Sequence, residues 1–116
     1  MDIIFSRGME KNCQDRKSAV REWGPEQGRQ IMRRIEELRD IQNLAQLWCF
    51  PAYRPHELTG DREGQISIDV KDPYRLIIIP ANDPIPRKSD GGLDRESITK
   101  ICIWEVVNTH DGKIKR

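Results

Sequence analysis

The chain has 116 residues, of which 36% are hydrophobic and 34% are charged. This length is typical of one domain with a thin hydrophobic core, and we expect residues 1–116 to form that domain. No apolar run approaches the ~20 residues that a membrane helix needs. Residues 1–17 lack the apolar segment of a secretory signal. These features predict a cytoplasmic protein with no membrane partner.

The net charge is +1, from 20 basic and 19 acidic residues. Both signs are spread evenly along the sequence, so no segment resembles a basic tail for binding nucleic acid. A protein that binds RNA with this balance must gather its arginines on one face of the fold.

The cysteines are scattered at Cys13, Cys49 and Cys102, and no two of them form a CxxC pair. This odd, dispersed set argues against a disulfide framework or a zinc site and predicts reduced thiols. The sequence also lacks a phosphate-binding glycine loop, a nucleophile elbow and a cluster of metal ligands. We therefore expect no metal and no cofactor.

The first half of the chain has the pattern of one strand followed by two helices. Residues 2–5, DIIF, are a short β-branched run that is typical of a strand. Apolar residues at helical spacing predict a helix over residues 8–23, which Gly24 and Pro25 end. The second helix starts at the proline and extends to Trp48. Its apolar face is formed by Ile31, Ile35, Leu38, Ile41, Ala45 and Trp48.

In the second half, alternation replaces helical spacing. Residues 65–70 alternate polar and apolar side chains, which predicts a half-buried strand. Residues 74–79 are apolar on both faces apart from Arg75, as in an interior strand. Residues 80–96 are rich in proline and glycine and predict a long surface loop. Residues 98–107 predict the last strand.

This order of elements predicts an α+β fold, in which two N-terminal helices pack on a mainly antiparallel sheet of four or five strands. The three tryptophans fall in the predicted helices and the last strand, which favours core packing over base stacking for all of them. They are Trp23, Trp48 and Trp104.

The chain has only two histidines, His56 before a predicted turn and His110 at the predicted end of the last strand. A neutral imidazole transfers protons readily near pH 7, so a histidine at a strand end is a candidate for acid–base work. The alternative is that each is a surface or capping residue, and composition alone favours this alternative.

Arg75 interrupts an otherwise apolar strand, and burying its charge without a partner would be costly. One interpretation is an ion pair with Asp61, Glu57 or Asp69. The other is a guanidinium that points into a concave sheet face and holds a phosphate. The residues alone leave both interpretations open, whereas Arg62, in a predicted turn, has the character of a solvated charge.

Residues 54–79, RPHELTGDREGQISIDVKDPYRLIII, resemble the central signature of the RelE/ParE toxin superfamily, in particular its HigB-like (plasmid maintenance killer protein) branch. There, a His-x-Leu-x-Gly-Asp-Arg-x-Gly run leads into a strand, a turn and a second strand with an aromatic–Arg pair. The ending EVVNTH is similar to the last strand of the family, and the resemblance covers about residues 2–110. The matching positions are His56, Leu58, Gly60, Asp61, Arg62, Gly64, Tyr74 and Arg75.

This resemblance implies a toxin of a type II toxin–antitoxin system with the RelE-like ribonuclease fold. Such toxins enter the ribosome, cut messenger RNA and so stop translation, with no metal. The ribose 2′-hydroxyl attacks the adjacent phosphorus, while the protein supplies positioning, proton transfer and positive charge. The implied partners are the ribosome, messenger RNA and a cognate antitoxin, usually a helix-turn-helix protein. The resemblance assigns proton transfer to His56 and His110. It assigns stabilisation of the phosphate to Arg62 and Arg75. Contact with the RNA is assigned to Arg54 and Thr109.

Asn108 and Thr109 depart from the family, which often has aspartate and tyrosine at these positions. Threonine cannot stack on a base, and asparagine cannot act as a base at neutral pH, so a reduced activity is expected here. Two alternatives on the same fold are a gyrase inhibitor like the ParE relatives and a catalytically inactive binding module. The His-x-Leu-x-Gly-Asp-Arg run favours cleavage. DNA binding is disfavoured, because predicted strands stand where a helix-turn-helix would need helices.

Overall fold

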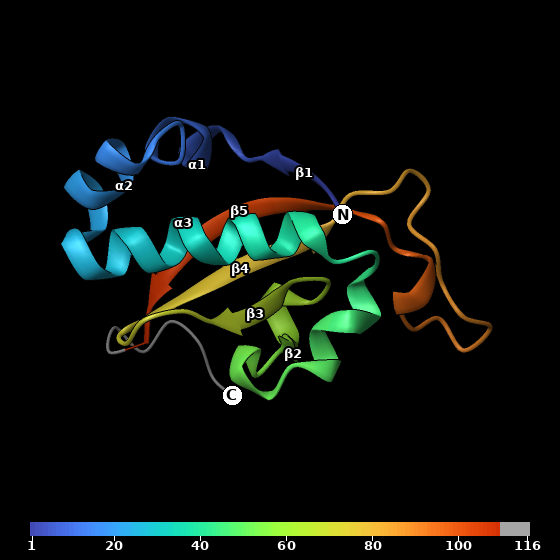
Figure 1. Ribbon diagram of the computed structural model, residues 1–116. Helices are drawn as coiled ribbons and strands as arrows, with labels where there is room; N and C mark the ends of the chain where they lie inside the picture. Colours follow the sequence, from blue (N-terminus) through green and yellow to red (C-terminus); the bar gives the residue numbers. More distant parts are fainter. Residues whose placement is uncertain (110–116) are drawn as a thin grey trace.

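The computed structural model describes residues 1–109, in which helices pack on a five-stranded sheet with α3 lying across it (Figure 1). The predicted α+β fold is confirmed. The helices are α1 (Arg7–Asn12), α2 (Arg16–Trp23) and α3 (Pro25–Asp40). The strands are β1 (Asp2–Phe5), β2 (His56–Glu57), β3 (Ile66–Asp69), β4 (Tyr74–Pro80) and β5 (Lys100–Asn108).

The sheet has the order β1-β5-β4-β3-β2. Strand β1 runs parallel to β5, and every other neighbouring pair is antiparallel, which confirms a mainly antiparallel sheet. The first strand of the chain therefore pairs with the last one. No helix within residues 1–109 is long and apolar enough to cross a membrane.

The predicted first helix is divided into α1 and α2. Asp15 caps α2, because its carboxylate accepts a hydrogen bond from the backbone N–H of Ser18 at 2.7 Å. A side chain that bonds the backbone in this way starts a new helix and ends the continuity of the previous one. The apolar spacing across this break is helical on both sides, so it does not reveal the interruption.

The predicted second helix is also shorter than expected, since α3 ends at Asp40 and not at Trp48. Asn43 caps the following 3-10 helix η1 (Leu44–Cys49), where it accepts a hydrogen bond from the N–H of Gln46 at 3.3 Å. Short 3-10 segments of this kind commonly continue the path of a helix. The apolar residues of η1 therefore still reach the core.

The main core lies between α3 and the sheet. Ile31, Ile35 and Leu38 of α3 are at most 1% exposed and contact the sheet face formed by Ile66, Ile68, Leu76, Ile78, Ile101 and Ile103. Helix α3 also packs closely on α2 at Gly28, where a Cβ atom would lie 2.6 Å from the carbonyl oxygen of Ala19. Glycine at this position allows the two helices to approach each other.

Residues 81–99 form the long connection between β4 and β5, as their prolines and glycines predict, and include the 3-10 helix η4 (Arg95–Ser97). Trp104 is 42% exposed, so the prediction that it packs in the core is wrong. The register pairs Ile77 with Glu105 but Ile78 with Ile103, which leaves Trp104 as the extra residue of a β-bulge.

Candidate functional site

The sheet face opposite α3 carries several of the predicted site residues. The register places His56 opposite Ser67, Ser67 opposite Ile77, and Ile77 opposite Glu105. Residues directly opposed in a sheet project to the same face, so these four residues form one row across β2, β3, β4 and β5. The next row consists of Asp69, Arg75 and Val107.

Arg75 is buried in this face, with only 1% of its side chain exposed. Its Nε donates to the Ser67 hydroxyl, and one terminal nitrogen pairs with the Asp69 carboxylate. The other terminal nitrogen donates to the carbonyl oxygens of Arg54 at 2.9 Å and of Ser67 at 3.0 Å. Of the ion-pair partners considered from the sequence, Asp69 is the one that the structure shows. The guanidinium is thus enclosed by protein groups and does not face solvent.

Arg54 lies beside the ion pair of Arg75 and Asp69. Unlike Arg75, it has an exposed side chain, and its backbone is left-handed. Its side chain is 57% exposed, and its guanidinium lies 3.6 Å from the second carboxylate oxygen of Asp69. Its φ of 42° and ψ of 58° are left-handed, and it is the one non-glycine residue with positive φ within residues 1–109. Such a conformation costs of order ~1–3 kcal/mol and persists only where the surroundings enforce it.

A small polar hollow of about 260 Å³ opens beside these groups. It brings together three of the residues predicted from the sequence, Arg54, Arg75 and Thr109. Both the backbone N–H and the hydroxyl of Thr109 donate to the carbonyl oxygen of Pro73, at 2.9 and 3.0 Å. Thr109 is thereby fixed at the turn between β3 and β4. The lining residues are Arg54, Asp69, Val70, Asp72, Pro73, Tyr74, Arg75 and Thr109.

Tyr74, Asp69 and Asp72 also line this hollow, although the sequence pattern assigns them no role in a site. Tyr74 was visible as the aromatic member of the Tyr-Arg pair, and this adjacency is the signal that could have identified it. The sequence indicates Asp69 only as an ion-pair partner. No sequence signal pointed to Asp72, which lies in the turn between the two strands.

Helix α3 also contacts β3 at Asp69. The Arg34 Nε donates to the carbonyl oxygen of Asp69 at 3.0 Å, and its guanidinium lies 4.5 Å from the centre of the Tyr53 ring. The Tyr53 hydroxyl donates to Glu37 at 3.1 Å. Burial raises the pKa of the Tyr53 phenol, and the negative charge of Glu37 adds to this rise. The phenol is therefore a neutral hydrogen-bond donor in this network at physiological pH.

His56 and Arg62 lie on the same sheet face as the hollow but do not line it. His56 is half-buried in β2, at the edge of the sheet. Arg62 donates to Gln65 at 2.8 Å and to Glu105 at 2.6 Å, and 26% of its side chain is exposed. His110 lies outside the described residues, so its predicted place at the site rests on the sequence alone.

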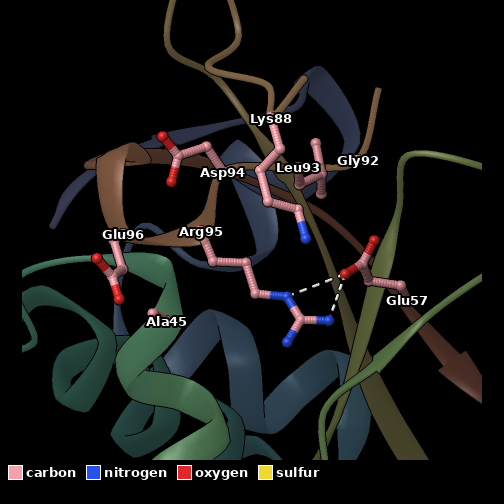
Figure 2. A pocket seen from close by; sticks show the side chains of 8 residues that line it. All are labelled: Ala45, Glu57, Lys88, Gly92, Leu93, Asp94, Arg95 and Glu96. Atoms are coloured by element: carbon pink, nitrogen blue, oxygen red, sulfur yellow. Dashed lines mark hydrogen bonds and ion pairs between the residues drawn. The ribbon is translucent and has the colours of Figure 1, made fainter. Parts of the chain in front are cut away.

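A second cavity, of about 580 Å³, lies between the long connection and β2. Figure 2 shows Arg95 reaching across it to Glu57, to which its Nε donates at 3.0 Å. The Arg95 guanidinium also lies 3.4 Å from the centre of the Trp48 ring, as in a cation–π contact. This cavity holds none of the predicted site residues. Its contacts attach the long connection to the strand that carries His56.

Arginines also gather on the helical side of the molecule. A hollow of about 670 Å³ between α2 and α3 is lined by three of them and by a single carboxylate. The even charge balance of the sequence therefore does not prevent a local excess of positive charge. The residues of this hollow are Arg16, Arg29, Gln30, Met32, Arg33 and Glu36.

Within residues 1–109, no group of three histidine, cysteine, aspartate or glutamate side chains is arranged to hold a metal ion. The three cysteines are free thiols; Cys13 and Cys102 are buried, and Cys49 is exposed. Comparisons of the chain with protein-family models, with curated proteins and with solved structures found no match. The case for a function therefore depends on the residues and geometry described above.

Proposed function

We propose that this protein is the toxin of a type II toxin–antitoxin system, a ribosome-dependent endoribonuclease that cleaves messenger RNA without a metal. The observation that carries the proposal is the polar hollow lined by the exposed Arg54, Tyr74 and Thr109, beside the sheet face that also holds His56 and Arg62. The resemblance of residues 54–79 to the RelE/HigB signature supports the same function.

The reaction needs a cation at the phosphate and groups that move protons. The 2′-hydroxyl loses its proton to a base as its oxygen bonds to phosphorus, the bond to the 5′-oxygen breaks, and that oxygen gains a proton. The products are a 2′,3′-cyclic phosphate and a 5′-hydroxyl end. We assign contact with the phosphate to Arg54, because its side chain is 57% exposed and lines the hollow. His56 and His110 are the candidates for proton transfer.

The arginine-lined hollow between α2 and α3 gives further support, because it supplies positive charge for an anionic partner such as ribosomal RNA. In this proposal the protein acts in the cytoplasm and is held inactive by a protein antitoxin.

One observation favours a second candidate function. The enclosed guanidinium of Arg75 and the paired guanidinium of Arg62 leave fewer cations for a substrate than the family signature implies. A non-enzymatic member of the same fold, either a gyrase inhibitor or an inactive binding module, would have no need of them. Primer extension on messenger RNA, compared with a gyrase supercoiling assay, distinguishes these functions.

The test is induction of the chain in cells that lack an antitoxin. We expect growth to stop and messenger RNA to be cut at ribosomes. We expect the variants His56→Ala and His110→Ala each to lower the cleavage rate about 10²–10⁴-fold, the usual contribution of a general acid or base. Glu96→Gln, on an exposed residue of the second cavity, is the matched control and should stay toxic. Full toxicity of both folded histidine variants would exclude the proposed chemistry.

A further inference from the structure

The buried guanidinium of Arg75 binds main chain as well as side chains. Two of its hydrogen bonds end on backbone carbonyl oxygens, those of Ser67 in the neighbouring strand and of Arg54. The planar guanidinium has five donors in a fixed geometry, so it can fix several acceptors relative to one another. Arg75 therefore links the interior of the sheet to the segment that enters β2.

Arg54 needs such a link, because its backbone is unfavourable in two ways. A side chain with a Cβ atom rarely adopts a φ of 42°. Pro55 follows directly, and a proline restricts the residue before it toward extended conformations. The local sequence thus favours a different backbone at Arg54. The hydrogen bond from Arg75 to the Arg54 carbonyl is a contact that opposes this preference.

The charged groups around the hollow give Arg54 and Arg75 different environments. The Asp69 carboxylate gives one oxygen to the Arg75 guanidinium and lies 3.6 Å from Arg54 through the other. Arg75 therefore offsets much of the Asp69 charge and leaves Arg54 as the exposed cation. Asp72 also lines the hollow.

We propose that Arg54 is the phosphate-binding residue of this hollow and that Arg75 is a positioning residue, which holds the Arg54 main chain in its left-handed conformation. This inference rests on the proposed function for the identity of the ligand, an RNA phosphodiester. It reverses the order of importance that the sequence signature suggests for the two arginines.

The first experiment measures binding of a 2′-O-methyl RNA oligonucleotide, which cannot be cleaved, to the parent, Arg54→Gln, Arg75→Lys and the double variant. We expect each single variant to bind about tenfold more weakly, as for one lost charge-assisted hydrogen bond. Because Arg75 acts through Arg54, the double variant should bind no more weakly than Arg54→Gln. Additive losses, about a hundredfold in the double variant, would show that Arg75 contacts the RNA itself.

The second experiment needs no RNA and tests the positioning directly. Arg54→Gly and Arg54→Ala both remove the side chain, but only glycine adopts a positive φ without strain. With Arg75 present, we expect the melting temperature of Arg54→Gly to be about 4–8 °C above that of Arg54→Ala. In the Arg75→Lys background this gap should vanish. Equal melting of the two variants in the parent, or a gap that persists in the Arg75→Lys background, would overturn the positioning role.

The two experiments separate the inference from the function on which it rests. A parent protein that neither binds the oligonucleotide nor cuts messenger RNA overturns the phosphate role of Arg54 together with the proposed function. A glycine–alanine gap that vanishes in the Arg75→Lys background would still support the hold of Arg75 on Arg54. RNA binding without that gap would overturn the positioning role alone.

Discussion

The two faces of the sheet are equally buried in places but are held together by different forces. The face under α3 is closed by aliphatic side chains, among them Ile35 against the strands. On the opposite face, the same strand β4 buries Arg75 at 1% exposure beside the small apolar cluster of Leu58, Ile77 and Val107. Burial of apolar area stabilises the first face, whereas satisfied hydrogen bonds make burial tolerable on the second. Equal burial therefore does not imply an equal response to substitution.

The largest expected effect tests the apolar face. Ile35→Ala should lower the free energy of unfolding by about 2–5 kcal/mol, because it leaves a cavity between α3 and the sheet. Ile35→Val, which removes one methylene group, should cost only about 0.5–1.5 kcal/mol. Urea denaturation of the three proteins measures both values. A loss below that of the valine variant would mean that this face is not the main source of stability.

The next effect concerns the approach of α3 to α2 on the same side of the molecule. Gly28→Ala should cost about 1–3 kcal/mol, because its Cβ would lie 2.6 Å from the Ala19 carbonyl oxygen and force the helices apart. Gly8→Ala in α1 is the matched control, since a Cβ there meets nothing within 4 Å. Alanine favours a helix over glycine, so the control should be neutral or slightly stabilising. Similar losses for both variants would contradict this account.

A smaller effect is expected from an ion pair at the rim of the sheet face opposite α3, which we call the open face. Arg62 and Glu105 are 26% and 39% exposed, so solvent screens their attraction. A double-mutant cycle of Arg62→Gln and Glu105→Gln should give a coupling energy of about 0.2–1 kcal/mol. Denaturation in low and high salt should show the coupling weaken as ionic strength rises. A coupling well above this range would place the pair among the buried contacts of this face.

The last prediction concerns reactivity and not stability. It compares the alkylation rates of cysteine thiols on the two faces of the sheet. Burial raises the pKa of Cys13, in the core under α3, to about 11, and it also raises the pKa of Cys102 on the open face. A higher pKa lowers the thiolate fraction at any given pH, so both should react slowly with iodoacetamide at pH 8. The exposed Cys49 should react first. Rapid alkylation of Cys102 in the folded protein would show that the open face is less shielded than described.

The apolar face could be predicted almost completely from the sequence. Ile31, Ile35 and Leu38 recur at helical spacing, and this periodicity alone places them on the core side of α3. The breaks after α1 and α3 could not be predicted in the same way. They depend on the side chains of Asp15 and Asn43 bonding nearby backbone N–H groups, and these hydrogen bonds leave the apolar spacing intact.

The candidate site was only partly predictable, because its key contacts are distant in sequence. The ion pair of Arg75 was one of two interpretations, and the choice of Asp69 depends on the strand register. The left-handed backbone of Arg54 runs against both its residue type and the following proline, so local propensity argues against it. In the structure its carbonyl oxygen accepts a hydrogen bond from the distant Arg75. The exposure of Trp104 likewise depends on a bulge that sequence alternation does not show.

The parallel pairing of β1 with β5 has a consequence for the order of folding. Strand β5 lies between β1 and β4, so the first strand has no place in the sheet until the last one is available. During synthesis, β1 emerges before β5 and must wait for residues 100–108 before it can join the sheet. Pairing between such distant segments delays folding, because a long loop must close first. The complete sheet, and the hollow beside the turn between β3 and β4, can therefore assemble only after β5 has left the ribosome.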